Sequence, residues 1–196
     1  MGRTRGFDAD DALDAALLTF WQRGFEATSM QALCRAMAVQ PGSLYAAFGG
    51  KRELFVAALR RYAQTVSVDA IHRITSAPTG LDGLRDYFGH LVEAMVDGNR
   101  RWGCLLTNSL VEFAGRDPEL AAIVTGHLAN LQAAFAAALA RCAAAGELRP
   151  GVDPDQAAAL LVAVVQGMNV LAKGRPGREP LRAVADAALA GLLRDA

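Results

Sequence analysis

The chain has 196 residues, of which 53% are hydrophobic and 20% are charged, so it is long enough and apolar enough to fold around a sizeable core. Equal numbers of basic and acidic residues give a formal net charge of zero. This balance argues against nucleic-acid binding driven by charge alone, while a dimer that reads a specific DNA sequence is still allowed. Alanine and leucine are abundant and runs of β-branched residues are absent, which predicts an all-α fold.

Cysteine and histidine usage indicates neither a metal site nor a disulfide framework, and no cofactor is expected. Cys34, Cys104 and Cys142 are widely spaced and lie in no CxxC pair, and the histidines show no HxxxH spacing. The longest apolar run, residues 157–165, is too short to cross a bilayer, and the N-terminus has no signal-peptide pattern. We expect a cytoplasmic protein that does not contact a membrane.

The chain begins with a basic arm and a scaffold helix. In residues 1–7, Arg3 and Arg5 would reach a phosphate or the minor groove of bound DNA, or else belong to a frayed terminus. A helix is predicted over residues 8–23, because acids favour its N-terminal end, an apolar stripe follows at helical spacing, and Gly24 ends it.

The stretch 28–48 predicts two short helices joined by a tight turn. A hydroxyl from Thr28 or Ser29 caps the first helix, which ends near Met37, and Pro41 suits the first turn of the second. The second helix buries two apolar side chains and leaves small or polar groups exposed.

The exposed side of the second helix favours a helix-turn-helix unit that lies against DNA. A surface that contacts base-pair edges excludes large apolar groups and carboxylates, and no acid occurs between Glu26 and Glu53. The alternative is an ordinary helical hairpin inside an all-α protein.

Six further helices are predicted, separated by breaks rich in glycine and proline. The first of them runs without a break from Lys51 towards Ile74 and would link two parts of the protein mechanically. The others are expected at 81–96, 104–114, 117–145, 153–172 and 180–194. With the three preceding elements they make nine helices.

The last two helices carry more apolar surface than a monomer core needs, which predicts self-association through this helical pair. The alternative is that both helices pack inside the monomer. The side chains expected at the interface are Leu161, Val164, Val165, Met168, Leu181, Val184, Leu189 and Leu192.

The identities of individual residues, beyond their spacing, show a resemblance to a known family. The string Gly24-Phe25-x-x-Thr28-Ser29-Met30, followed by Val39-x-x-Gly42-Ser43-Leu44-Tyr45-x-x-Phe48-x-x-Lys51, closely resembles the DNA-binding domain of the tetracycline-repressor (TetR) family. The resemblance implies a three-helix DNA-binding domain at 1–50 and a helical effector-binding and dimerisation domain at 51–196. It also implies a homodimeric repressor that binds a pseudo-palindromic double-stranded DNA operator and is not an enzyme.

The same resemblance implies individual DNA contacts. Thr28 and Tyr45 would contact phosphates, and Lys51 would contact the DNA backbone. The residues that would face bases are Gln40, Pro41, Gly42, Ser43 and Ala46. Ala38 departs from the family pattern, which has glycine there, so a left-handed backbone at this turn would cost about 1 kcal/mol.

Cys104 lies at the predicted start of a helix beside Arg100 and Arg101, where the helix dipole and cationic neighbours favour a thiolate. A small buried packing residue is an equally open interpretation. The string Gly103-Cys104-Leu105-Leu106-x-Asn108-x-x-x-Glu112 is similar to a branch of the family in which a cysteine here responds to electrophiles or reactive chlorine species. That resemblance implies Lys173 as a partner of the cysteine.

A reversible small molecule in an apolar pocket is the competing effector hypothesis. The expected pocket lining is Trp102, Leu106, Asn108, Phe113, His127, Gln166 and Asn169. No catalytic constellation occurs in the sequence. The alternative function is therefore an all-α small-molecule-binding protein or enzyme whose helical hairpin is structural.

Overall fold

The computed structural model describes residues 8–113 and 116–194, and in these ranges the protein folds into helices without a β-strand. Arg3 and Arg5, and the predicted end of the sixth helix at 114–115, lie outside the described residues. If α4, η1 and α5 are counted as one continuous helix, the described residues form nine helices beside one short 3₁₀ turn, which confirms the predicted all-α fold. The elements are α1 (Ala9–Arg23), α2 (Met30–Ala36), α3 (Pro41–Phe48), α4 (Lys51–Tyr62), η1 (Ala63–Ser67), α5 (Val68–Ser76), α6 (Gly80–Val96), η2 (Asn99–Trp102), α7 (Leu105–Phe113), α8 (Pro118–Ala144), α9 (Pro154–Ala172) and α10 (Arg178–Leu192).

Local signals place α2, the turn and α3. Ser29 rather than Thr28 caps α2, because Ser29 Oγ accepts the backbone N–H of Ala32 at 3.1 Å. Ala38 has a φ of 54°, the left-handed conformation expected at this turn. Pro41 lies in the first turn of α3, where no N–H is needed.

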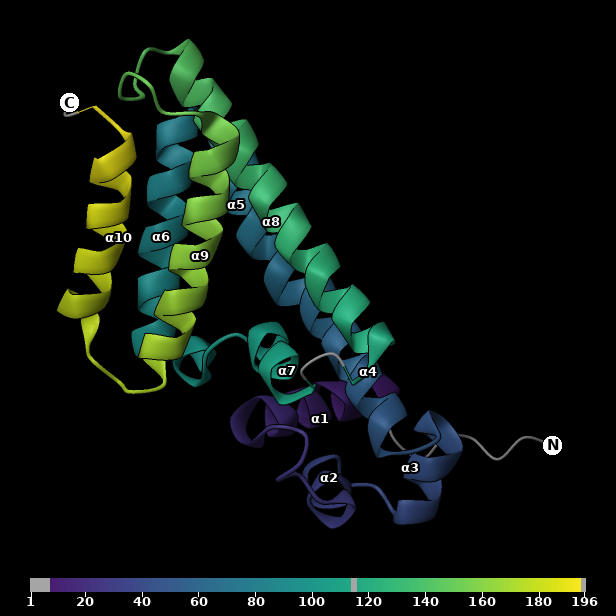
Figure 1. Ribbon diagram of the computed structural model, residues 1–196. Coiled ribbons are helices and arrows are strands. Elements are labelled where there is room, and N and C mark those ends of the chain that lie inside the picture. Colours follow the sequence, from purple (N-terminus) through teal and green to yellow (C-terminus); the bar gives the residue numbers. More distant parts are fainter. Residues whose placement is uncertain (1–7, 114–115, 195–196) are drawn as a thin grey trace.

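One helical rod, made of α4, η1 and α5, leads away from the three N-terminal helices (Figure 1). The sequence predicts a helix from Lys51 towards Ile74, and the structure extends it to Ser76. Its middle, Ala63–Ser67, is π-helical, which the sequence did not predict. Such turns are frequent at functional sites.

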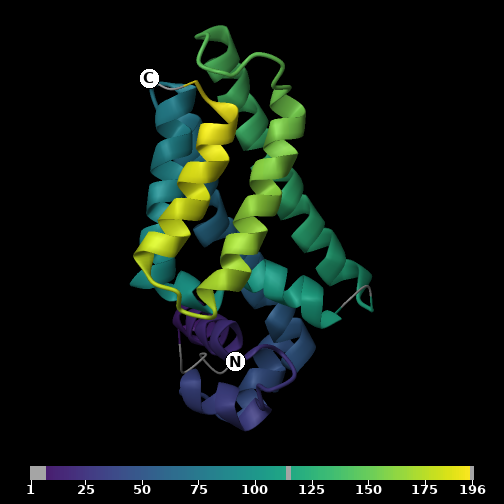
Figure 2. The same ribbon diagram turned by 60° about the vertical axis from the view of Figure 1, so that its left-hand side comes forward.

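Buried apolar side chains gather in two clusters. One lies among α1 to α4 and includes the starts of α7 and α8. The other lies among α5, α6, α8, α9 and α10. Figures 1 and 2 show α1 to α3 at one end of the molecule, α9 and α10 side by side towards the other, and α7 between them.

The two long helices α8 and α9 begin at Asp-Pro pairs, as predicted. Asp117 accepts the N–H groups of Glu119 and Leu120, and Asp153 accepts the N–H of Gln156. Both helices are long and apolar enough to cross a membrane, by length and composition only. This is weak evidence, because core helices of soluble proteins meet the same criterion.

Most side chains predicted to lie at the dimer interface are buried inside a single chain, so the prediction is wrong for them. Those buried inside a single chain are Leu161, Val165, Met168, Leu181, Leu189 and Leu192. Val164 and Val184 are half-buried and pack against the same core. The physical reason is that one stripe of α9 and one of α10 fill the monomer core. A different stripe of α9 is exposed, where Leu160, Val170 and Leu171 are 50%, 62% and 51% exposed.

Candidate functional sites

The surface of α3 is small, polar and free of acids. Leu44 is fully buried and fixes the helix against its neighbours. A Cβ atom added at Gly42 would meet no other atom within 4 Å, so this backbone is open to an approaching partner. The exposed residues are Gln40, Pro41, Gly42, Ser43, Tyr45 and Ala46. One short helix and its N-cap thus present together the groups that the sequence predicts to face bases and, in Tyr45, a phosphate.

Thr28 and Lys51, which are also predicted to contact DNA, are less exposed than the residues of α3. Thr28 is fully buried and its hydroxyl donates to the carbonyl of Gly24 at 2.6 Å, so its prediction as a phosphate contact is wrong for this conformation. Lys51 is half-buried, and its Nζ lies 4.3 Å from the centroid of the Phe25 ring. A cation–π contact therefore holds this ammonium group at the start of α4.

Cys104 is buried at the N-cap of α7. It is 2% exposed, and its carbonyl accepts the N–H of Asn108 at 2.9 Å, which starts the helix. The Tyr62 hydroxyl donates to its sulfur at 3.6 Å. Arg100, which is itself only 7% exposed, lies over the Tyr62 ring at 5.6 Å from the centroid. The cysteine is thus enclosed with a phenol and a guanidinium.

These neighbours set the protonation of the cysteine. Burial raises the pKa of the Cys104 thiol, but the Arg100 guanidinium, the N–H of Thr107 and the Tyr62 hydroxyl outweigh it, so the pKa lies below its usual value. In contrast, burial and then Glu147 raise the pKa of Cys142 to about 11. The surroundings of Cys104 favour a thiolate, as predicted, while its role as a sensor stays a prediction.

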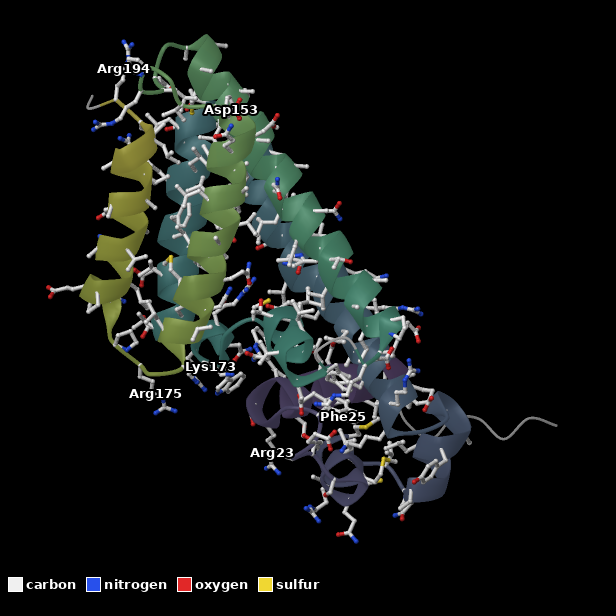
Figure 3. The ribbon with its side chains drawn as sticks, in the orientation of Figure 1. Arg23, Phe25, Asp153, Lys173, Arg175 and Arg194 are labelled. Atoms are coloured by element: carbon white, nitrogen blue, oxygen red, sulfur yellow. The ribbon has the colours of Figure 1, made fainter. Side chains whose placement is uncertain are left out.

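Lys173 is not a neighbour of the cysteine sulfur in this conformation. Its Nζ donates to Asn108 Oδ1 at 2.9 Å, and Figure 3 shows it at the end of α9 near α7. The side chains that act on the Cys104 sulfur are Arg100, Tyr62 and Thr107. Asn108 holds the ammonium group at the surface in this conformation, while the Lys173 side chain passes beside Gly103. The implied role of Lys173 as a partner of Cys104 stays a prediction.

The predicted pocket residues do not share one cavity. Leu106 is fully buried, and the half-buried Phe113 packs its ring 5.1 Å from Phe25 and 5.6 Å from Phe55, between α7 and the first helices. Trp102 is half-buried, and its carbonyl accepts the side-chain amide of Asn108 at 2.9 Å. Leu106 and Phe113 thus join elements, whereas Trp102 and Asn108 also line a cleft of about 560 Å³ together with Lys173.

Three polar members of the predicted pocket lie on α8 and α9. Gln166 accepts a hydrogen bond from the Thr107 hydroxyl of α7. Asn169 is 2% exposed, and its side-chain amide has no hydrogen-bond partner within the described residues. Burial, and then the charge of Arg100, lower the pKa of His127 to about 4, so this imidazole is neutral at pH 7.

Three hydrogen bonds join the cysteine region to α1 and the turn that follows it. Trp21 Nε1 of α1 donates to the carbonyl of Gly103 at 2.8 Å. The two carboxylate oxygens of Glu112, on α7, accept the N–H groups of Phe25 and Glu26 at 3.0 and 2.7 Å. Sequence reasoning missed these links, because the partners lie 82 to 87 positions apart in the chain.

Two family profiles match the chain. The one described as bacterial regulatory proteins of the tetR family matches residues 12–58, and the one described as a tetracyclin repressor-like C-terminal domain matches residues 80–188. The protein belongs to the TetR family. As a TetR-family protein it is a DNA-binding transcriptional regulator, and it is not an enzyme.

Curated relatives and solved structures agree with this assignment. The protein is 34% identical over 155 residues to an uncharacterised HTH-type regulator of Bacillus subtilis, YezE, a match that covers 79% of each chain. It is 29% identical to the repressor ComR of Escherichia coli, covering 96% of this chain and 90% of ComR. A cysteine mutant of the TetR-family regulator CifR, complexed with 26-base-pair operator DNA, is 33% identical and aligns with a TM-score of 0.83 over 97% of this chain and 100% of that one. Reduced Escherichia coli NemR, at 21% identity and a TM-score of 0.80 with 98% of each chain covered, shares the fold.

Proposed function

We propose that this TetR-family protein is a cytoplasmic homodimeric repressor in which residues 1–50 bind a pseudo-palindromic operator and residues 51–196 dimerise and respond to a chemical signal. The exposed, acid-free surface of α3 carries the DNA-binding part of the proposal. Two copies of α3 must lie about 34 Å apart to enter successive major grooves. The operator-DNA complex of CifR supports binding to an operator, and ComR, which is a repressor, supports the sign of regulation.

The dimer would form through the exposed stripe of α9 and the adjoining face of α10. Leu160, Val170 and Leu171 are the large apolar side chains of this stripe. Between and beside them the exposed residues are small, which allows two backbones to approach closely: Ala159, Ala163 and Gly167 on α9, and Ala183, Ala187, Ala190 and Gly191 on α10. This face replaces the interface predicted from the sequence.

An electrophile would act at Cys104. The thiolate adds to an electron-poor carbon–carbon double bond, a carbon–sulfur bond forms, and the resulting carbanion takes a proton from water. The adduct can no longer form the thiolate that Arg100 favours, and it needs space next to Gly103, whose carbonyl accepts a hydrogen bond from Trp21 of α1. Modification would thus favour a conformer in which the two α3 helices no longer match the operator.

Gly42→Ala tests the DNA-binding surface. The added methyl group meets no atom of the protein, so it should leave the fold intact and stabilise α3 by up to about 0.5 kcal/mol. We expect operator affinity to fall about tenfold or more, because the methyl group occupies the space that bases approach. Gel shifts with DNA from upstream of the protein's own gene measure the affinity, and chemical denaturation measures the stability.

Gly126→Ala on α8 is the matched control, since Gly126 is also helical, exposed and without atoms near an added Cβ. It should leave operator affinity unchanged. Equal affinities of wild-type protein and Gly42→Ala would remove α3 from the DNA contact.

Labelling with N-ethylmaleimide tests the cysteine. Mass spectrometry should show modification of Cys104 well before Cys142, whose raised pKa keeps it protonated at neutral pH. The labelled protein should release operator DNA, and Cys104→Ser should not respond. Faster labelling of Cys142, or unchanged DNA binding after complete labelling of Cys104, would contradict the proposal.

A further inference from the structure

Arg100 is a buried cation without an acidic partner. It is 7% exposed, and within residues 8–113 and 116–194 no ion pair joins it to an aspartate or glutamate. The groups that act on its guanidinium are Tyr62, Tyr87 and Cys104. A buried charge of this kind is costly unless an anion or several hydrogen bonds compensate it.

A cavity of about 190 Å³ opens beside this guanidinium. At roughly 30 Å³ per water molecule it has room for about six waters, or for a small organic molecule. Most of its wall is apolar and comes from η1, α5 and α6, with Asp69 and His90 exposed. Asp69 pairs with Arg73 at 3.4 Å, so its charge is partly compensated. The lining residues are Val66, Asp69, Ala70, Tyr87, His90, Leu91, Ala94 and Arg100.

We propose that this cavity binds a small organic carboxylate, with its carboxylate on Arg100 and its apolar part against Val66, Leu91 and Ala94. A guanidinium presents a planar fork of donors that fits a carboxylate with two parallel hydrogen bonds. The apolar walls favour an aromatic or short aliphatic body over a free inorganic anion. The inference rests on the proposed function, because it identifies the chemical class of a reversible effector in the same domain.

The ligand site and the cysteine share one cation. Arg100 also stabilises the Cys104 thiolate, and both Arg100 and Tyr87 line the cavity. A bound carboxylate compensates the positive charge of the guanidinium. The thiolate of Cys104 is then less favoured, and the cysteine reacts more slowly. By reciprocity, modification of Cys104 to a neutral thioether leaves Arg100 free for a carboxylate, which then binds more tightly. The two signals would thus be coupled through a single side chain.

Benzoate and benzamide provide a matched pair of probes for the intact wild-type protein, since they share size and shape and differ in charge. Isothermal titration calorimetry should give about tenfold tighter binding of benzoate, because a hydrogen bond to a charged group exceeds a neutral one by about 1.4 kcal/mol. Saturating benzoate should slow N-ethylmaleimide labelling of Cys104 about tenfold, while benzamide at equal occupancy should not. Equal binding of the two probes, or no binding of benzoate at millimolar concentration, would overturn the proposal.

Two variants locate the site. Arg100→Lys keeps the charge and loses the planar fork, so benzoate should bind more weakly while the protein stays folded. Ala94→Phe fills the cavity without touching the cysteine and should abolish binding of benzoate but not labelling of Cys104. Arg85→Gln, an exposed arginine on α6, is the control and should change neither measurement. Unchanged benzoate affinity in both site variants would also overturn the proposal.

The outcomes separate this inference from the proposed function. If labelling of Cys104 releases operator DNA and benzoate does not bind, the carboxylate site fails and the repressor mechanism stands. If benzoate binds and protects Cys104 while neither treatment releases DNA, the site stands and the proposed response fails.

Discussion

At the scale of single residues, burial decides which titratable groups matter. His127 and Cys104 both lie near Arg100, and the same cation lowers the pKa of each. For the imidazole, burial acts in the same direction and the neutral form results. For the thiol, burial raises the pKa and the cation lowers it, and the net lowering favours the thiolate.

The neutral state of His127 predicts a pH dependence of stability. Between pH 6.5 and about 4 the unfolded chain binds a proton at His127 that the folded protein does not, so stability falls as the pH falls through this window. The loss is at most about 3 kcal/mol. His127→Gln should show a correspondingly flatter profile in urea denaturation at stepped pH, whereas His72→Gln, at an exposed histidine, should keep the wild-type slope. Parallel profiles for wild type and His127→Gln would contradict the prediction.

At the scale of elements, α7 is held to the DNA-facing helices by one carboxylate and one indole. The Glu112 carboxylate bridges two backbone N–H groups in the turn after α1, and Trp21 reaches the backbone just before α7. These contacts, with the rod of α4, η1 and α5, are the connections through which the proposed response at Cys104 would reach α3.

Glu112→Gln should weaken this connection. A neutral amide accepts one of the two N–H groups and turns its own NH₂ towards the other, so the free energy of unfolding should fall by about 1–2 kcal/mol. We also expect less release of DNA per modified Cys104. Glu119→Gln, which disturbs exposed ion pairs to Arg52 and Arg60, is the comparison and should change stability little. Wild-type stability and response in Glu112→Gln would rule out this coupling route.

At the scale of the whole molecule, the monomer core and the proposed dimer face use different stripes of α9. Gly167→Glu adds a charge where a Cβ meets no atom of the monomer, so it should leave the monomer folded and dissociate the dimer. Leu161→Ala should do the reverse, with a stability loss of about 2–5 kcal/mol and an intact dimer. Light scattering coupled to size-exclusion chromatography gives the mass, and thermal denaturation gives the stability. A monomeric wild type at micromolar concentration would contradict the homodimer itself.

The sequence by itself determined the number and order of the long helices and several of their starts. A hydroxyl cap at Thr28 or Ser29, Pro41 and the Asp-Pro pair at 117–118 act on backbone groups a few positions away, so their effect can be deduced from neighbouring residues alone. The structure decided the cap in favour of Ser29. The acid-free surface of α3 follows from the composition of that stretch, whereas the left-handed turn at Ala38 was expected from the family resemblance. The division of the chain after residue 50 stays a prediction.

Only the tertiary structure decided which of these elements meet. Leu161 and Leu160 are both apolar residues of α9, and one is fully buried while the other is 50% exposed, because α9 can turn only one stripe towards the monomer core. Arg100 could be recognised in the sequence as a cation near Cys104, but its burial against Tyr62 and a cavity depends on helices far away in the chain. Contacts across such separations depend on how apolar stripes pack, and periodicity identifies a stripe without identifying its partner.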